Sequence, residues 1–139
     1  MRNGKVVVYA SVVGDLLHIG HLKLLEQAKM FGDYIIVGVV TDKGCKKYKR
    51  EPIIPFKERK ELIKAIWCVD KVVSQSGQDP TGNLKADQSI DILVHGDDWD
   101  ENYPAFEYMR KMGKEVVRLP YYKKQSTTKI IARILELGR

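Results

Sequence analysis

The sequence predicts a doubly wound α/β fold, in which helices cover both faces of a parallel five-stranded sheet. Short runs of β-branched residues alternate along the chain with segments whose apolar residues have helical spacing, and this alternation is typical of parallel sheets with right-handed crossovers. Residues 34–40 are apolar without interruption, as expected for a strand covered on both faces. Because the chain has 139 residues, we expect one domain that spans residues 1–139.

Five short runs rich in Val and Ile are predicted to be the strands of this sheet. They are residues 5–9, 34–40, 71–73, 90–94 and 115–119. The first run follows the turn residues Asn3 and Gly4, and the last is stopped by Pro120, which cannot donate to a strand ladder.

Four segments carry apolar residues on one helical face and are predicted to be helices. They are residues 19–31, 58–67, 103–112 and 127–137. Glycines end the first and the third, and Ser126 caps the fourth. We expect residues 43–55 to form a loop because its two prolines exclude a regular helix, and residues 75–83, rich in Gly, Pro, Asp and Ser, to form another.

The charge of the chain favours a partner that carries phosphate. There are 24 Lys and Arg residues against 18 Asp and Glu, a formal net charge of +6. This excess suits either a nucleic acid or a nucleotide. The densest basic run, residues 43–50, is short and local, which favours a phosphate pocket over a long nucleic-acid track.

Several classes of protein are excluded by composition. No stretch approaches the ~20 uncharged apolar residues that span a bilayer, and the N-terminal residues lack a signal-peptide pattern, so we expect no membrane insertion and a cytoplasmic location. Cys45 and Cys68 form no CxxC pair, and we expect two reduced thiols, one in a loop and one on a buried helix face. Three histidines make a His and Cys zinc cage improbable.

Four polar segments follow the predicted strands and mark one edge of the sheet. They are His18, the basic run 43–50, residues 96–98 and the pair Ser126-Thr127. In open parallel sheets, ligands bind outside the carboxyl ends of the strands. We therefore expect these segments to form one site.

The string from Asp15 to His21 carries the strongest chemical signal. His18 and His21 are three residues apart at a predicted helix start and so lie on the same side of its first turn. Gly20 leaves room for a phosphate near the backbone, and helix N-terminal amides favour an anion. Imidazole N–H groups can then stabilise the charge that develops when an α-phosphate is attacked.

His18-Ile19-Gly20-His21 resembles the HxGH signature of the nucleotidyltransferase superfamily. This superfamily includes cytidylyltransferases, phosphopantetheine and nicotinamide-mononucleotide adenylyltransferases, and class I aminoacyl-tRNA synthetases; the last are excluded by length and by their missing second signature. Three further stretches resemble the cytidylyltransferases: residues 48–53 with the pair 58–59, residues 94–99 (Val-His-Gly-Asp-Asp-Trp) and residues 126–131 (Ser-Thr-Thr-Lys-Ile-Ile). The resemblance implies a Rossmann-like fold and a CTP-dependent reaction that releases pyrophosphate.

The resemblance also implies roles for the matching positions. Lys49 matches a lysine that bridges the nucleotide phosphates and the acceptor phosphate, and Asp98 matches an acceptor for the cytosine amino group. The implied groups are catalytic His18, His21 and Lys49; nucleotide-binding Asp15, Gly20, Arg59, Gly96, Asp98, Ser126, Thr127 and Thr128; and acceptor-binding Lys47, Arg50, Tyr121 and Lys123. Lys47 and Arg50 can equally be surface charge, and Ser126 can be a plain helix cap as well as a phosphate ligand. The family implies Mg²⁺ with CTP, no metal site in the protein and a homodimer.

Two departures from the family pattern bear on the acceptor. Residues 121–125 (Tyr-Tyr-Lys-Lys-Gln) replace an arginine-bearing segment, and Trp67 replaces a basic residue before the third strand. Aromatic faces attract cations, so an amine-bearing acceptor, 2-aminoethylphosphonate or phosphoethanolamine, is favoured over glycerol 3-phosphate. Alternatively, Trp67 packs in the core on its helix and the tyrosines cover the sheet edge.

Rival functions remain open from the sequence. One is a degenerate, non-catalytic nucleotide-binding sensor, against which the retained His and Lys positions argue. An adenylyltransferase of the same superfamily, similar to FAD synthetases, would use ATP and give Asp98 no role in base choice. A basic nucleic-acid-binding module would need aromatics interleaved with Lys and Arg along one face. Residues 121–124 are the only such patch, and we therefore expect no nucleic-acid partner.

Overall fold

In the part of the chain that the computed structural model describes, residues 1–120 and 122–138, five parallel strands form one sheet in the order β3-β2-β1-β4-β5. The strands are β1 (Val7–Val12), β2 (Tyr34–Val40), β3 (Lys71–Gln75), β4 (Ile92–Gly96) and β5 (Glu115–Leu119). The helices are α1 (Ile19–Lys29), α2 (Asp42–Lys46), α3 (Phe56–Lys64), α4 (Thr81–Ala86), α5 (Pro104–Lys111) and α6 (Thr127–Leu137). The predicted α/β fold with a parallel, Rossmann-like sheet is confirmed.

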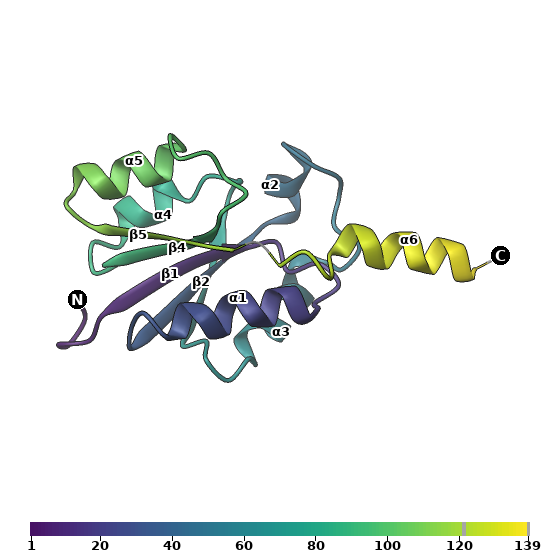
Figure 1. Ribbon diagram of the computed structural model, residues 1–139, viewed down its shortest axis with the longest axis horizontal. Helices are drawn as coiled ribbons and strands as arrows, with labels where there is room; N and C mark the ends of the chain where they lie inside the picture. The colour runs from purple at the N-terminus through teal and green to yellow at the C-terminus, as the bar shows by residue number, and fades with distance from the viewer. Residues whose placement is uncertain (121, 139) are drawn as a thin grey trace.

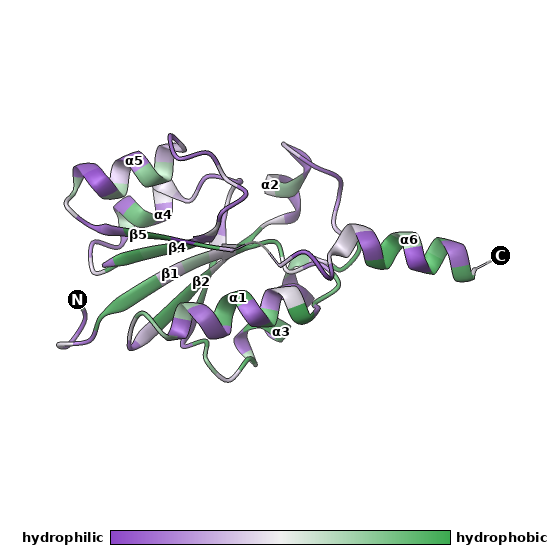
Figure 2. Cartoon of the chain, in the orientation of Figure 1, coloured by the Kyte–Doolittle hydropathy of each residue, from purple (hydrophilic) through white to green (hydrophobic). Residues whose placement is uncertain are grey.

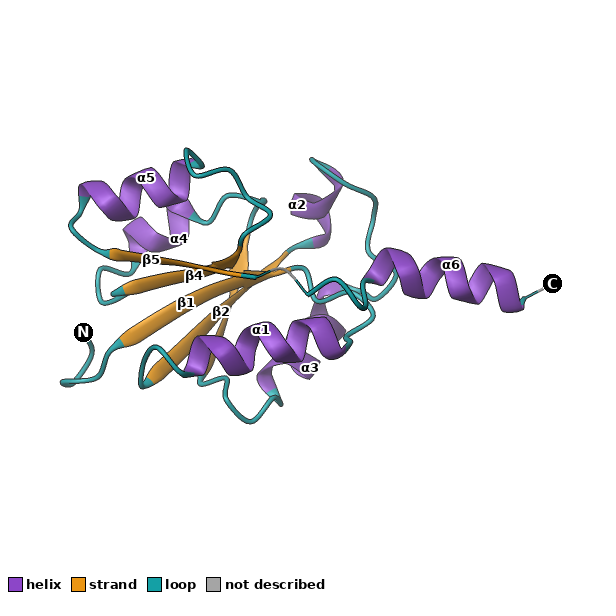
Figure 3. Ribbon diagram, in the orientation of Figure 1, coloured by secondary structure: helices purple, strands orange, loops and turns teal. Residues whose placement is uncertain are grey.

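Helices cover the two faces of the sheet in separate layers (Figures 1 and 3). Helices α1 and α3 lie on one face, and α4 and α5 lie on the other. Alternate residues of a strand point to opposite faces, so Val8 of β1 packs with Leu25 of α1, whereas Tyr9 packs with Phe106 and Met109 of α5. Every residue of β1 is buried, and Figure 2 shows the apolar colour concentrated in the central strands.

The strand order reverses between β1 and β4, and this reversal positions the site. Strand β1 pairs with β2 over six residue pairs, Val7↔Tyr34 to Val12↔Val39, but with β4 over only three, Val8↔Ile92 to Ala10↔Val94. The crossovers leave β1 and β4 in opposite directions, so a crevice opens at their carboxyl ends. Helices α2 and α6 both lie at this edge of the sheet (Figure 1).

Two short helices lie where the sequence predicted loops. Helix α2 occupies the start of the basic segment because Thr41 caps it, its Oγ1 accepting the N–H of Gly44, and because the prolines come only after the helix has ended. Helix α4 falls in and after the predicted loop 75–83 and buries Leu84. Cys45 therefore lies in a helix rather than a loop, and Cys68 lies beyond the end of α3; both are free and buried.

Other boundaries shift by a few residues. Helix α3 begins two residues earlier than predicted and ends at Lys64, three residues earlier. Strand β4 begins at Ile92 rather than Ile90, because the N–H of Ile90 closes a turn onto the carbonyl of Asp87.

Helix α6 projects from the carboxyl edge of the sheet (Figure 1). Its sequence is amphipathic, yet none of its residues is buried. Across residues 1–120 and 122–138, no helix has the length and apolar character that a membrane span requires.

Candidate active site

A cavity of about 610 Å³ lies at the carboxyl ends of β1 and β4. Its lining comes from both halves of the sheet and from the start of α6. Twelve of the residues that the sequence pointed to are among those that line it: Asp15, His18, Gly20, His21, Lys49, Arg50, Gly96, Asp98, Lys123, Ser126, Thr127 and Thr128. Segments far apart in the chain therefore meet at one place, as the strand-end argument predicted.

A second cavity of about 270 Å³ adjoins the first. The two share part of their lining, including Lys49, Asp98 and His95, and the smaller one is completed by Tyr48, Gln78, Trp99 and Val40. The site therefore has two compartments, and Lys49 borders both.

His18 and His21 cap α1 reciprocally. His18 is the N-cap, and its Nδ1 accepts the N–H of Gly20 at 3.0 Å. His21 is the third helical residue, and its Nδ1 accepts the N–H of His18 at 3.1 Å. Because Nδ1 is an acceptor in both rings, the proton of each neutral imidazole is on Nε2. Each ring thus keeps one N–H donor for a ligand in the cavity that it lines.

Both imidazoles are held neutral. Burial lowers the pKa of His18, and burial together with the neighbouring charge of His18 lowers the pKa of His21 to about 4. The ring centroids are 3.9 Å apart, so a second proton on the pair would be repelled by the first. At neutral pH, the pair therefore acts as two uncharged hydrogen-bond donors.

Gly20 lines the larger cavity and also leaves room for the His18 ring. A Cβ on Gly20 would lie 2.8 Å from Cε1 and 3.0 Å from Nδ1 of His18. A side chain at this position would therefore collide with the His18 ring, whose Nδ1 accepts the Gly20 N–H.

Asp15 joins three segments of the site. The residue is only 2% exposed. Its carboxylate accepts hydrogen bonds from the N–H groups of Ile53 and Ile54 at 2.9 Å and from Nη1 of Arg50 at 3.1 Å. Burial alone would raise its pKa, but these donors together hold the pKa below its usual range. Its carbonyl accepts Oγ1 of Thr127 at 2.8 Å. Asp15 thereby ties the loop after Lys49 and the start of α6 to the start of α1.

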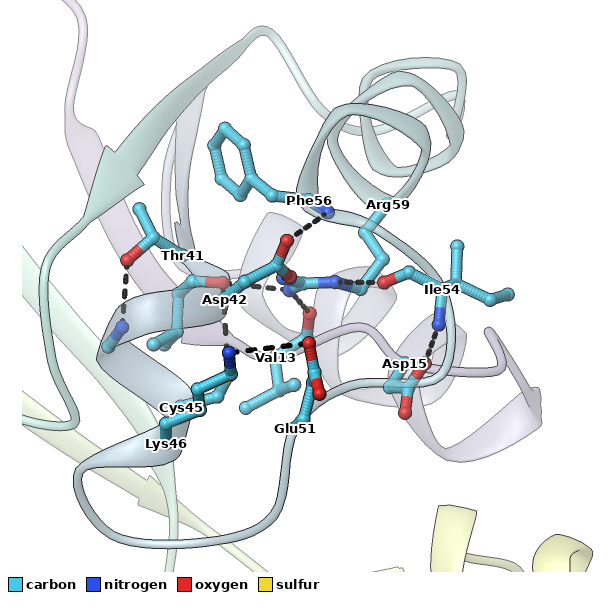
Figure 4. A network of polar contacts seen from close by, with 12 residues as sticks. Val13, Asp15, Thr41, Asp42, Cys45, Lys46, Glu51, Ile54, Phe56 and Arg59 are labelled. Carbon is cyan, nitrogen blue, oxygen red and sulfur yellow. Dashed lines mark hydrogen bonds and ion pairs between the residues drawn. The ribbon is translucent and has the colours of Figure 1, made fainter.

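Arg59 lines neither cavity, contrary to its expected role as a nucleotide-binding residue. Its side chain is fully buried, and Figure 4 shows the guanidinium at the centre of a polar network. Nε donates to the carbonyl of Ile54 at 2.9 Å, Nη1 donates to the carbonyls of Val13 at 2.6 Å and Val40 at 2.8 Å, and Nη2 donates to Asp42 Oδ1 at 2.7 Å. An arginine at a helix N-terminus needs compensation for the helix dipole, and these acceptors supply it.

Two other residues predicted from the sequence lie elsewhere. Lys47 does not line either cavity, and its Nζ donates to the carbonyl of Ser76 at 3.4 Å. Trp67 is 70% exposed, and its Nε1 donates to Glu26, so it is neither in the core nor at the cavity, and both interpretations of it are wrong. Tyr121 lies outside the described residues.

The start of α6 brings hydroxyl and main-chain groups to the larger cavity. Ser126 caps the helix, its Oγ accepting the N–H of Lys129 at 3.1 Å. Thr127 is held by its bond to Asp15. With Thr128, these residues place the positive end of an eleven-residue helix at the cavity wall, an arrangement that favours a phosphate group.

His95 belongs to residues 94–99, a stretch that resembles the cytidylyltransferases, but the sequence predicted no role for it. Its Nδ1 lies 3.1 Å from the carbonyl oxygen of Gly96, and because that oxygen only accepts, Nδ1 carries the proton. Its ring stacks on Trp99 with centroids 3.2 Å apart, and burial lowers its pKa to about 4. His95 is therefore neutral and leaves Nε2 as an acceptor. Its place in residues 94–99 was the signal that could have identified it.

No group of three His, Cys, Asp or Glu residues within residues 1–120 and 122–138 is arranged to hold a metal ion.

The chain is similar to several known proteins. Residues 15–133 match the family model described as "Cytidylyltransferase-like". The chain is 36% identical to a glycerol-3-phosphate cytidylyltransferase of Bacillus subtilis (strain 168) over 96% of this chain and 98% of that protein. It is 39% identical to an FAD synthase of Thermococcus onnurineus (strain NA1) over 95% of this chain and 93% of that one. A solved structure, the lipopolysaccharide core biosynthesis protein from Thermoplasma volcanium GSS1, superposes with a TM-score of 0.74 and 26% identity, covering 86% of this chain and 100% of that one.

Proposed function

Because the chain belongs to the cytidylyltransferase-like family, we propose that it transfers CMP from CTP to a small phosphate or phosphonate acceptor and releases pyrophosphate. Its homologues are nucleotidyltransferases, and so is this chain. The observation that carries the finer proposal is the pair of adjoining cavities, with two neutral histidine donors on the larger and Lys49 bordering both.

CTP occupies the larger cavity in this proposal. The triphosphate lies along His18, His21 and the start of α6, and the base lies toward Gly96 and Asp98. The Asp98 carboxylate accepts a hydrogen bond from the cytosine amino group and would repel a carbonyl oxygen at that position, which favours CTP over UTP.

An oxygen of the acceptor attacks the α-phosphorus in line, so that one P–O bond forms while the bond to the β-phosphate breaks and pyrophosphate leaves. The protein supplies positioning and charge stabilisation rather than a nucleophile. Lys49 draws the acceptor anion toward the α-phosphate, and the Nε2–H groups of His18 and His21 donate to oxygens that gain charge in the transition state.

Mg²⁺ would be held by the CTP phosphates, because no group of three His, Cys, Asp or Glu among residues 1–120 and 122–138 is arranged to hold it. It commonly binds through nucleotide phosphates and retains waters, and when bound it supplies neutralisation of the leaving pyrophosphate. The Ser126 hydroxyl and the main-chain N–H groups at the start of α6, including that of Thr127, hold the same end of the nucleotide.

The smaller cavity is proposed to hold the acceptor, and an amine-bearing molecule fits it best. Tyr48 and Asp98 line it, and an aromatic ring and a carboxylate can each attract an ammonium group, by roughly 0.5–2 kcal/mol for the aromatic contact. Lys49 meets the anionic end. We therefore expect 2-aminoethylphosphonate or phosphoethanolamine to be preferred over glycerol 3-phosphate. The basis for this preference is Tyr48 and Asp98 and no longer Trp67.

One assay tests the proposal directly. The protein is incubated with Mg²⁺, each of the four nucleoside triphosphates and each of these three acceptors, and pyrophosphate release is measured. We expect turnover with CTP and the highest kcat/KM with an amine-bearing acceptor. A preference for glycerol 3-phosphate would refute the acceptor assignment and leave the CTP assignment intact.

The second candidate is an adenylyltransferase that makes FAD. It is favoured by the 39% identity to archaeal FAD synthases over nearly the full length of both chains. It predicts pyrophosphate release from ATP with FMN and none from CTP, so the same assay separates the two functions when FMN is added to the acceptors.

We also propose that the enzyme is a homodimer in which a second copy covers α6. Ile134, Leu135 and Leu137 are each more than half exposed on this helix, and apolar clusters of this kind mark protein interfaces. Sedimentation velocity should give a dimer for the wild type and a monomer for Ile134→Glu, with Arg133→Glu on the same helix as the control. A monomeric wild type would contradict this part of the proposal.

A further inference from the structure

The turn that follows β4 is held by an arginine from the neighbouring strand. Arg118 of β5 pairs in register with His95 of β4. Its Nη2 donates to the carbonyl of Asp97 at 2.9 Å and to the carbonyl of Trp99 at 2.5 Å. The two carbonyls are those on either side of Asp98, so one guanidinium group fixes the main chain around that residue.

The side chain of Asp98 depends on this main-chain support. It is about half exposed, and its carboxylate lies 4.0 Å from Nδ1 of His95, beyond hydrogen-bond distance. His95 therefore does not hold the carboxylate, and the backbone of the turn fixes the Cα–Cβ bond from which the side chain extends. Further supports of the turn are the Asp97 N–H, which donates to the carbonyl of Leu119, and the Trp99 ring, which stacks on His95 and on Tyr103.

Packing does not explain an arginine at this position. The Nε of Arg118 is buried and has no acceptor among the described residues, a cost that an apolar side chain on β5 would avoid. The benefit that offsets this cost is the pair of bonds to the turn. The third contact of Arg118, from Nη1 to the Glu101 carboxylate at 3.4 Å, is an exposed ion pair and contributes little to stability.

We infer that Arg118 is a positioning residue for base recognition: by holding the carbonyls of Asp97 and Trp99, it aims the Asp98 carboxylate into the junction of the two cavities and thereby sets the preference for CTP. This inference rests on the proposed function. Hydrogen-bond discrimination between bases needs an acceptor placed to within a fraction of an ångström, and Arg118 supplies that placement without touching the nucleotide.

The test compares Arg118→Met with Arg110→Met. Arg110 also donates to this segment, through Nη1 to the carbonyl of Glu101, but its bond lies three residues beyond Asp98. We expect Arg118→Met to lower the ratio of kcat/KM for CTP to that for UTP by about 10- to 100-fold, mainly through a higher KM for CTP. Arg110→Met should change the ratio less than about threefold. Arg118→Lys, whose ammonium keeps N–H donors but lacks the planar fork of the guanidinium, should fall between.

A double-mutant cycle separates positioning from a general loss of structure. Asp98→Asn removes the carboxylate that Arg118 is inferred to aim, so Arg118→Met added to Asp98→Asn should lower the CTP preference no further. Independent additive losses would refute the inference. If Arg118→Met does not fold, Arg118→Lys carries the same cycle.

Fluorescence provides a readout besides activity. The chain has two tryptophans, and Trp67→Phe leaves Trp99, whose carbonyl Arg118 holds, as the reporter. In that background, Arg118→Met should shift the emission of the free protein to longer wavelength, and Arg110→Met should not. An unchanged emission together with an unchanged CTP to UTP ratio would overturn the inference while the proposed function stands. A wild-type protein without any CTP preference would instead refute the proposed function.

Discussion

The ring of His18 lies 3.9 Å from the ring of His21, centroid to centroid, and each accepts a main-chain N–H of the same helical turn at Nδ1. One set of bonds thus caps α1, fixes the tautomer of both rings and leaves both Nε2–H groups for the ligand. Structural and chemical roles are combined in the same two side chains, and substitutions can separate them.

His21→Asn should remove activity and leave the fold intact. The Asn carbonyl can take the place of Nδ1 and accept the His18 N–H, but nothing replaces the Nε2–H donor. We expect kcat to fall by roughly 10²- to 10³-fold, with an unfolding midpoint close to that of the wild type. His21→Ala should lose the cap as well, at a cost of about 1 kcal/mol. Near-normal turnover in the Asn variant would contradict the donor role of His21.

The stability of the protein should fall as the pH drops from about 6.5 to about 4. Burial lowers the pKa of His21 and of His95 to about 4, so between these pH values the unfolded chain binds protons that the folded chain does not. The contribution of each neutral histidine to the free energy of unfolding is therefore fully present above pH 6.5. At pH 5 that free energy is lower by on the order of 2 kcal/mol for each histidine. Urea unfolding at pH 7.5 and 5 measures the difference, and His21→Asn should lack its share. An equal pH dependence in both proteins would show that His21 is not the group that titrates.

Gly20→Ala should damage the site without damaging the helix. The added Cβ would lie 2.8 Å from Cε1 of His18, which must then move, whereas Ala is the better helix former by about 1 kcal/mol. We expect at least a tenfold fall in kcat, with the free energy of unfolding changed by less than about 1 kcal/mol because the weakened cap and the gain in propensity oppose each other. Gly82→Ala is the matched control, since Gly82 is also the second residue of its helix and a Cβ there meets nothing within 4 Å. It should leave kcat unchanged.

Arg59→Met should destabilise the fold by about 3–5 kcal/mol, because it leaves three main-chain carbonyls without their buried donor. Arg59→Lys should recover little, since one ammonium cannot reach the same four acceptors. Urea unfolding measures both, with Arg133→Met, which breaks an exposed ion pair on α6, as a control expected near zero. A stable Arg59→Met protein with a raised KM for CTP would restore the nucleotide-binding role that the structure argues against.

The order of the elements could be predicted from the sequence because strand and helix signals in this chain depend on local pattern. The five apolar runs are in the sheet, and α6 begins after Ser126 as its capping pattern predicts. Helix α2 could not be predicted because it is too short to show periodicity and because its cap, in which the Gly44 N–H donates to Oγ1 of Thr41, is a single local bond.

The site could be predicted only to the level of which segments meet. His18, Lys49, Asp98 and Ser126 line one cavity, as predicted from their positions after strand ends. This could be predicted because the topology of a parallel sheet places those ends at one edge. The direction of each side chain could not be predicted, because it depends on partners distant in the chain. Arg59 is turned inward by the carbonyls of Val13 and Val40, and no local pattern in the sequence indicates that pairing.

The pairing between β1 and β4 is short, and the cavity lies between the two halves of the protein that this pairing joins. A ligand in the cavity therefore contacts both halves. His18 and Lys49 belong to the half built on β1 and β2, whereas Asp98 and Thr127 belong to the half that contains β4 and β5, and only three residue pairs join the halves along the sheet. A nucleotide that touches both halves binds only when they are joined and so opposes their separation. Amide hydrogens of residues 8–10 and 92–94 should therefore exchange more slowly when CTP is bound, by a factor that grows with CTP concentration, while those at the β2–β3 edge change less.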